Sequence, residues 1–428
     1  TAASNVAVGY KSLKEISSGA SNVAIGLNAG AESDVEDDNV FIGKDSASLM
    51  KGQQNVAVGK DALKGASFTD ATCHVTSGND AIPHDSNANI LAGMGVKGTG
   101  IPAGAYIQNK DSNTQFTLNS SFTPTAGDGS EITLTFYSRV SQTIAIGADA
   151  LTSNERGTYN NAIGYTAGTA LTTGSRNVMY GTQAGERITT ANENVLIGNS
   201  TGAGLTTSGN NTYVGHAVAA NASSTGHSNT LVGSAVASSG ALTGNYNVGM
   251  GRNALVSLTS GVENIAIGHE AGDAITSDTR VVAIGKGAYS ANDDTSGHDG
   301  TAGNGSGNIA IGYNSMTALA GSAALKNTAV GYETMADASA VSITDNTAIG
   351  FQALKSINHN DGDNNTAIGS KTLMDLTEGA NNVAVGAETL ENLTTGDHNT
   401  CIGKKVLNSA TGAESNNVAI GSSAMQNT

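Results

Sequence analysis

A short motif of alternating polar and apolar positions recurs along this chain, with the form Asn-x-Ala-Ile/Val-Gly. Alternation over a few residues is typical of a β-strand, and the glycine with the polar residues after it indicates a turn. Most successive copies are about 17 to 19 residues apart, a regular period that predicts a stacked array of repeats. The closing glycines of the twenty copies are Gly9, Gly26, Gly43, Gly59, Gly147, Gly164, Gly181, Gly198, Gly215, Gly233, Gly251, Gly268, Gly285, Gly312, Gly331, Gly350, Gly369, Gly386, Gly403 and Gly421. Two intervals, Gly59 to Gly147 and Gly285 to Gly312, are longer than the rest.

The first position of the motif is Asn in 18 of the 20 copies, and only Thr143 and Val281 depart from it. An Asn that lies directly above and below other Asn residues in a stack can form a ladder of amide hydrogen bonds. It can also close a turn by bonding to nearby backbone groups. We therefore expect this column of Asn side chains to fix the register of the stack.

The third position is Ala in 13 copies, and the fourth is Ile or Val in 18. Adjacent side chains of a strand point to opposite faces, so these two positions lie on different sides of the sheet. We expect the larger Ile or Val to fill the core of the chain. The Ala column is then expected to face a close neighbour, such as another copy of the chain near a symmetry axis.

A second, weaker element follows the glycine and often reads Ala-Leu or Ala-Gly, as at Ala62-Leu63, Ala353-Leu354 and Ala271-Gly272. A polar turn comes next, so one repeat is expected to contain a strand, a bend, a short second strand and a polar loop. Such a unit buries its apolar side only by stacking on its neighbours. The predicted fold is all-β: a stacked parallel β-roll or β-solenoid of about 20 repeats of about 17–19 residues, as a homotrimer, with one small inserted β domain.

The insertion interrupts the period between about residues 66 and 141. It contains all three prolines, Pro83, Pro102 and Pro124, and four of the six Phe residues. Short alternating segments at 105–108, 115–118 and 131–136 predict β-strands. The expected organisation is β-roll repeats over 1–65, a small β domain over 66–141 and further repeats over 142–428. The insert is either a projecting module that binds a receptor or glycan, or a decoration that widens and stiffens the stack.

Composition narrows the classes of function. The formal net charge is −16, which disfavours a nucleic-acid partner because phosphate binding requires clustered Lys and Arg. An acidic surface suits an extracellular protein, and no apolar run reaches the ~20 residues of a membrane-spanning helix. The sequence shows no signal peptide and does not start with Met, so its ends are expected to belong to a longer or processed polypeptide.

The segments 22–26, 264–268 and 365–369, which read NVAIG, NIAIG and NTAIG, resemble the head repeats of trimeric autotransporter adhesins of the YadA type. They are equally similar to the repeats of phage tail fibres. The resemblance covers most of the chain outside the insertion and implies a homotrimeric, left-handed parallel β-roll that binds a host or another surface. Adhesin heads usually have a shorter repeat, so the longer repeat of this chain favours the fibre type.

Few residues suggest chemistry. Acidic loops occur at 32–38, at Asp293-Asp294 with His298-Asp299, and at Asp361 and Asp363, and they are interpreted as solvated loops because none has the spacing of a calcium site. The eight His residues are scattered, and His216 and His269 follow the motif glycine, where a Tyr is expected to be exposed. Cys73 and Cys401 are interpreted as small buried thiols rather than a disulfide or metal pair. No catalytic, cofactor-binding or metal-binding residue is assigned.

The sequence therefore predicts a structural or adhesive fibre protein rather than an enzyme. The favoured interpretation is a shaft or head segment of a phage tail fibre that contributes to host attachment through a cell-surface glycan or protein receptor. One alternative is the head of a bacterial trimeric adhesin at the outer-membrane surface. Another, from a different class, is a polysaccharide-degrading tail spike, which would use paired carboxylates. The low aromatic content, 4% with no Trp, disfavours a sugar-cleaving cleft.

Overall fold

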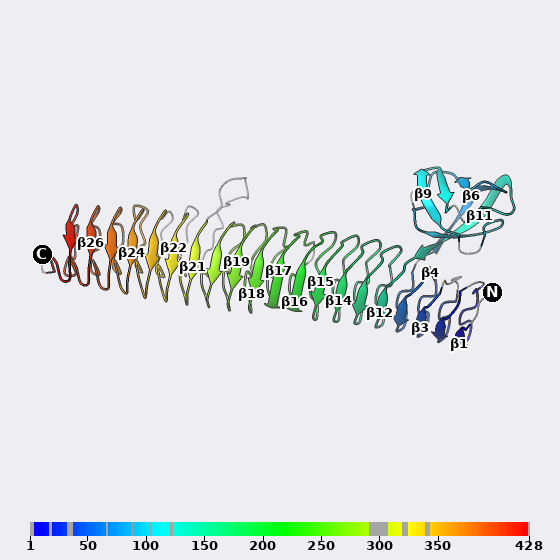
Figure 1. Ribbon diagram of the computed structural model, residues 1–428, viewed down its shortest axis with the longest axis horizontal. Helices are drawn as coiled ribbons and strands as arrows, with labels where there is room; N and C mark the ends of the chain where they lie inside the picture. The colour runs from blue at the N-terminus through cyan, green and yellow to red at the C-terminus, as the bar shows by residue number, and fades with distance from the viewer. Residues whose placement is uncertain are drawn as a thin grey trace. The chain divides into compact units, whose positions relative to one another are not determined.

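The computed structural model describes residues 4–16, 19–31, 37–65, 67–87, 89–102, 105–119, 123–221, 223–290, 307–318, 324–338 and 343–426. The chain forms two compact units, Thr1–Asn210 and Asn211–Thr428. The secondary structure of the described residues consists of strands, turns and bends, without helix. Within each unit, short parallel strands stack in sequence order (Figure 1). These observations confirm the predicted all-β solenoid with a small extra sheet.

Each copy of the motif forms one strand of the stack, mostly of three residues, and within each unit every strand pairs in parallel with the next copy. The strands of the first unit are β1 (Val6–Val8), β2 (Val23–Ile25), β3 (Val40–Ile42), β5 (Val56–Val58), β12 (Ile144–Ile146), β13 (Asn161–Ile163), β14 (Val178–Tyr180) and β15 (Val195–Ile197). Strand β5 pairs directly with β12, so the stack continues across the insertion.

Twelve further strands of the same kind are described in the second unit. They are β16 (Thr212–His216), β17 (Thr230–Ser234), β18 (Val248–Met250), β19 (Ile265–Ile267), β20 (Val282–Ile284), β21 (Ile309–Ile311), β22 (Thr328–Val330), β23 (Thr347–Ile349), β24 (Thr366–Ile368), β25 (Val383–Val385), β26 (Thr400–Ile402) and β27 (Val418–Ile420). The register matches identical motif positions, for example Ala348 with Ala367.

The segment after the motif glycine is a turn, and the predicted second strand was wrong. Counting the motif Asn as position one, residues at positions seven and nine have left-handed backbone angles. In one repeat these are Gln352 (φ 52°) and Leu354 (φ 51°). Two residues of left-handed conformation, separated by one residue that is not left-handed, reverse the direction of the chain, whereas a strand needs negative φ throughout. The turn is therefore tight enough to bring the chain back within one repeat.

The Asn column forms the predicted ladder. The side-chain oxygen of Asn365 accepts the backbone N–H of Asn382 at 3.0 Å and its side-chain amide at 3.0 Å. The same amide also donates to the carbonyl of Gly396 in the following loop at 2.8 Å. Asn399 repeats this pattern on Asn382 one turn later. These buried side chains therefore join three successive turns through satisfied polar groups.

The chain compensates for the missing amide at Val281. The backbone N–H of Val281 still donates to the side chain of Asn264, at 2.9 Å. The Val side chain, however, has no polar group to bond to the next turn. The hydroxyl of the buried Tyr289 takes over and accepts the side-chain amide of Asn308 at 3.0 Å. The hydroxyl also contacts the carboxylate of Asp278 at 3.4 Å. The ladder is thus interrupted without leaving Asn308 unsatisfied.

Core volume is shared between position three and position nine. Where position nine is Leu, as at Leu63 and Leu354, position three of the next turn is Ala or Cys. Where position three is large, position nine of the preceding turn is small: a Cβ on Gly30 would lie 3.0 Å from Phe41, and one on Gly168 would lie 2.8 Å from Met179. A close-packed interior tolerates one large side chain at this level but not two.

The insert has two small sheets and its own apolar core. Its strands are β6 (Ser67–Thr76), β7 (Ala81–Pro83), β8 (Gly95–Lys97), β9 (Ile107–Ser112), β10 (Gln115–Leu118) and β11 (Asp128–Arg139). Strand β10 pairs antiparallel with β7 and β9, and β11 pairs antiparallel with β6 and β8. The buried residues include Ile82, Phe116 and Phe136. The strands predicted at 115–118 and 131–136 are confirmed, and the one predicted at 105–108 begins later, at Ile107.

Several contacts hold the insert against the stack of its own unit. Strand β11 pairs in parallel with β4 (Met50–Lys51), which belongs to the turn before β5. Arg156 donates to the carbonyl of Ala92 at 2.9 Å. Lys97 and Glu15 form an ion pair at 2.7 Å, and this hydrogen bond, together with Lys14, lowers the pKa of Glu15 to about 2. These contacts fix the insert at several points rather than through a single flexible linker.

Candidate functional site

The exposed face of the stacked sheet is apolar, and the predicted sides of Ala and Ile/Val are reversed. From β2 onward the position-three side chains are buried within the chain, as Ala348 and Ala367 illustrate. The position-four side chains point outward, and Ile349 and Ile368 are 40% and 38% exposed although turns flank them on both sides. The turn is so tight that its interior takes only Ala beside the position-nine Leu. The larger Ile is therefore excluded to the surface.

The two outward columns at positions two and four contain no charged residue, in contrast to position six, which includes Lys and Arg. Positions two and four provide forty outward sites over the twenty strands, occupied almost entirely by Val, Ile and Thr. Charged residues make up 13% of the chain, so about five would be expected among forty positions. Contiguous apolar surface on a soluble protein usually marks an interaction site, and loss of charge is typical of the centre of an interface. This face, the outward columns of the stacked strands, is the strongest candidate functional surface.

A third outward column follows the glycine, at position six. The parallel hydrogen bonds continue past the glycine, since the N–H of Gly350 donates to Val330 at 2.8 Å and that of Gln352 to Tyr332 at 2.9 Å. Positions two, four and six therefore share one face. Tyr10, Tyr165, Tyr313, Tyr332 and Phe351 occupy this column and are exposed, as predicted for the residue after the glycine. His216 and His269 stand in the same column.

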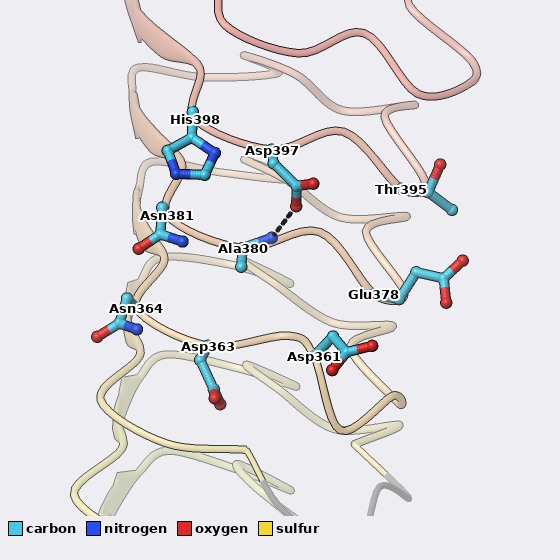
Figure 2. A pocket seen from close by; sticks show the side chains of 9 residues that line it. All are labelled: Asp361, Asp363, Asn364, Glu378, Ala380, Asn381, Thr395, Asp397 and His398. Carbon is cyan, nitrogen blue, oxygen red and sulfur yellow. Dashed lines mark hydrogen bonds between the residues drawn. The ribbon is translucent and has the colours of Figure 1, made fainter.

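A polar pocket lies on the loop side of the second unit, with a volume of about 530 Å³. Figure 2 shows its nine lining residues, which come from three successive turns. They are Asp361, Asp363, Asn364, Glu378, Ala380, Asn381, Thr395, Asp397 and His398. Four carboxylates in one hollow suggest a site for a cation, but each of them already has a partner in the protein.

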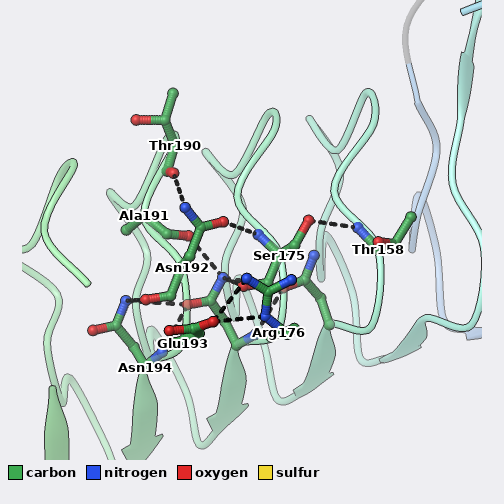
Figure 3. Close-up of polar contacts among 10 residues, drawn as sticks. Thr158, Ser175, Arg176, Thr190, Ala191, Asn192, Glu193 and Asn194 are labelled. Atoms are coloured by element: carbon green, nitrogen blue, oxygen red, sulfur yellow. Dashed lines mark hydrogen bonds and ion pairs between the residues drawn. The ribbon is translucent and has the colours of Figure 1, made fainter. Parts of the chain in front are cut away.

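Two of the carboxylates accept backbone hydrogen bonds from the turn before them, and equivalent side chains of several other turns do the same; we call such a side chain a brace. Two residues before the motif Asn, a side-chain oxygen accepts the backbone N–H of the equivalent residue one turn earlier. Figure 3 shows this for Asn192, which accepts the N–H of Ser175 at 2.7 Å, and for Ser175, which accepts that of Thr158 at 3.1 Å. Asp363 and Asp397 do the same for Thr344 and Ala380, each at 2.7 Å.

One of these side-chain acceptors is missing within the pocket. Ala380 occupies the brace position between Asp363 and Asp397 and has no side chain to reach the turn before it. The N–H of Asp363 instead donates to the carbonyl of Asp361 in its own loop, at 3.0 Å. Asp361 and Glu378 both approach His359, at 3.4 and 3.6 Å. The hollow thus coincides with a missing side chain, and its four carboxylates already contact neighbouring groups of the protein.

Restoring the brace is expected to stabilise the loops. Ala380→Asn supplies an oxygen that accepts the N–H of Asp363, as Asn192 does for Ser175. Because the N–H of Asp363 exchanges its bond to Asp361 for one across the turns, the gain is at most the worth of one neutral hydrogen bond, about 0.5–1.5 kcal/mol in the free energy of unfolding. Hydrogen exchange at the amide of Asp363 should slow accordingly. Ala380→Val fills similar space without an acceptor, and equal slowing in that control would contradict the interpretation.

The remaining acidic and His residues do not converge on a site. Within the acidic loop at 32–38, only Asp37 and Asp38 are described, and Asp37 braces the N–H of Ala20 at 2.8 Å. The loop with Asp293, Asp294, His298 and Asp299 lies outside the described residues. Across the described ranges, no group of three or more His, Cys, Asp or Glu side chains is arranged to hold a metal ion.

Both cysteines are buried free thiols, as predicted. Burial raises the pKa of Cys73 to about 12 and that of Cys401 to about 11. Thiols of this kind react slowly because the thiolate is the reactive form. Nor does the part of the chain described here include a helix long and apolar enough to cross a membrane.

Comparison with known proteins identifies no relative: no family model, curated protein or solved structure matches the chain. The apolar sheet face therefore carries the functional argument by itself.

Proposed function

We propose that this chain is a structural, adhesive segment of an extracellular fibre, with a shaft or head segment of a phage tail fibre as the favoured setting. The observation that supports this role is the apolar sheet face described above, whose columns at positions two and four carry no charged residue. The proposed role is non-enzymatic. The head of a bacterial trimeric adhesin remains the alternative setting, and the length of the repeat favours the fibre.

The partner proposed for the sheet face is another copy of this chain, in a homotrimer. In the second unit, twelve strands spaced by ~4.8 Å and three outward columns spaced by ~7 Å, the third of which includes Arg252, Lys286 and Lys404, give a face of roughly 55 by 14 Å. That area, on the order of 800 Å², is what one partner contributes to a standard stable interface. A rigid surface with one strand per ~4.8 Å is matched best by a surface with the same repeat. The number three comes from the resemblance of the motif to trimeric fibres.

Self-association leaves the loops and the insert to contact the host. The insert lacks the repeat and is held at several points by Lys97, Arg156 and strand β4. A module fixed in this way presents its surface in one orientation, which lowers the entropic cost of binding to a receptor. We propose the insert and the loops as the contact with a cell-surface glycan or protein.

The association is tested by placing charge on the sheet face. We expect Ile349→Lys combined with Ile368→Lys to weaken self-association at least about a hundredfold, because each copy then buries two unpaired charges. The fold of the single chain should survive, since both side chains point outward. Sedimentation velocity against concentration measures the association, and circular dichroism checks the fold.

A matched control places the same charges on the loops. Asn364→Lys with Asn381→Lys alters exposed residues directly before the motif Asn, where Lys326 stands naturally in another turn with the same left-handed backbone. This variant should associate like the parent protein. Equal weakening by both variants would point to general electrostatic repulsion, and an unchanged face variant would exclude the sheet face as the contact.

A further inference from the structure

Self-association through a repetitive face raises the problem of register along the stack. In the second unit, the outward columns at positions two and four are nearly uniform in Val, Ile and Thr. If one copy slides by one turn, eleven of the twelve strand levels still meet an equivalent level. Register is weakly specified in any such surface, unless a local feature distinguishes one level from the next.

Position six of the second unit is more varied, and it contains one run of aromatic residues. Tyr313, Tyr332 and Phe351 lie in position six of three consecutive turns and stack on one another. The ring centroids are 5.0 and 5.5 Å apart, and the ring planes are inclined by only 11° and 16°. All three side chains are 39–45% exposed. We call these three residues the aromatic stack.

The aromatic stack has distinct ends. On one side Lys286 places its ammonium group 5.6 Å from the ring centre of Tyr313. On the other side, position six of the next turn is Ser370. The bulky apolar levels are therefore bounded by a cation and by a small polar residue. Their position on the outward face follows from the hydrogen bonds that continue past the glycine, including Lys371 N–H to Phe351 at 2.8 Å.

We propose that the aromatic stack fixes the register between associated copies of this chain, an inference that rests on the self-association proposed above. In register, the three aromatic levels of one copy meet those of its neighbours. A slip of one turn removes one aromatic level and sets Phe351 beside Ser370, and a slip of two turns removes two levels. Each aromatic contact favours the correct register beyond the area it buries.

Disulfide formation between two marked chains measures the register. Chains carrying Ile349→Cys are co-assembled with chains carrying Val385→Cys, two turns or about 10 Å farther along the stack. A disulfide needs Cα atoms within about 7 Å, so the mixed disulfide forms only after a two-turn slip. Cys73 and Cys401 do not interfere because both are buried.

The test adds Tyr313→Ser, Tyr332→Ser and Phe351→Ser to both marked chains; Ser370 and Ser234 show that position six accepts Ser. We expect the assembled mass to be retained and the mixed disulfide to rise about tenfold or more. Tyr246→Ser, which removes an exposed ring outside the three columns, should leave the disulfide at background.

The outcomes separate the two proposals. An assembled triple variant without the mixed disulfide overturns the role in register and leaves self-association standing. Dissociation of the triple variant also overturns it, because the aromatic stack would then supply affinity. If the parent chains do not associate at all, the proposed function fails and this inference fails with it.

Discussion

Replacing Phe41 by Ala is expected to lower the free energy of unfolding by about 3–5 kcal/mol, and adding Gly30→Leu to recover most of the loss. Phe41 is fully buried at position three, and Gly30 lies in position nine of the turn before it. The truncation leaves a cavity, and a Leu at position 30 would occupy it. Leu already adopts the required left-handed backbone at Leu354, Leu373 and Leu390, where position three of the next turn is Ala or Cys.

The single substitution Gly30→Leu is expected to be destabilising, since its Cβ alone would lie 3.0 Å from the ring of Phe41. The two changes are therefore expected to show a large favourable coupling in a double-mutant cycle. Hydrogen exchange at the amides of Val23 and Val40 measures the local stability, because a repeat array does not unfold in one step. Gln53→Ala, on an exposed loop, is the control. Independent effects of the two substitutions would contradict the shared-volume account.

Replacing Asn382 by Ala is expected to cost about 3–5 kcal/mol locally, because several buried groups lose their partners at about 1–3 kcal/mol each. The change removes two donors, to Asn365 at 3.0 Å and Gly396 at 2.8 Å, and an acceptor of two bonds from Asn399 at 3.0 Å each. Exchange of the Asn399 and Val383 amides should accelerate strongly.

The neighbouring loop provides the control for this substitution. Thr395→Ala removes a partly exposed side chain beside Gly396, leaves the ladder intact and should change stability by less than about 0.5 kcal/mol. If Asn382→Ala behaves like Thr395→Ala, the amide ladder does not stabilise the stack. Val281 shows that the ladder tolerates a gap only with compensation, here the hydroxyl of Tyr289.

The repeat, the parallel stack and the Asn ladder were predictable because each depends on spacing along the sequence. The side of the sheet taken by Ala and Ile was not. Both residues are apolar, and their alternation along the strand indicates only that they lie on opposite sides of the sheet. The deciding quantity is the interior volume of the turn, which is set by left-handed residues such as Gln352 and Leu354. These left-handed φ values leave no simple signature in the sequence, because Leu is not expected in the left-handed region.

The candidate surface was predicted only in part. Exposure of the residue after the glycine was expected, but its membership of an apolar face depends on the reversed placement of Ile349 and its equivalents. The pocket was unpredictable because its nine lining residues come together only when three successive turns stack. The brace position varies among Asp, Asn and Ser, so its common role appears only when the turns are stacked.

The mass of the chain in solution tests the central claim most directly. Sedimentation equilibrium at micromolar concentration should give three times the chain mass of 42.6 kDa. That result would agree with burial of the apolar sheet face between copies. A single species of 42.6 kDa at tens of micromolar would contradict the account, because the apolar face of Ile and Val would then remain in contact with water.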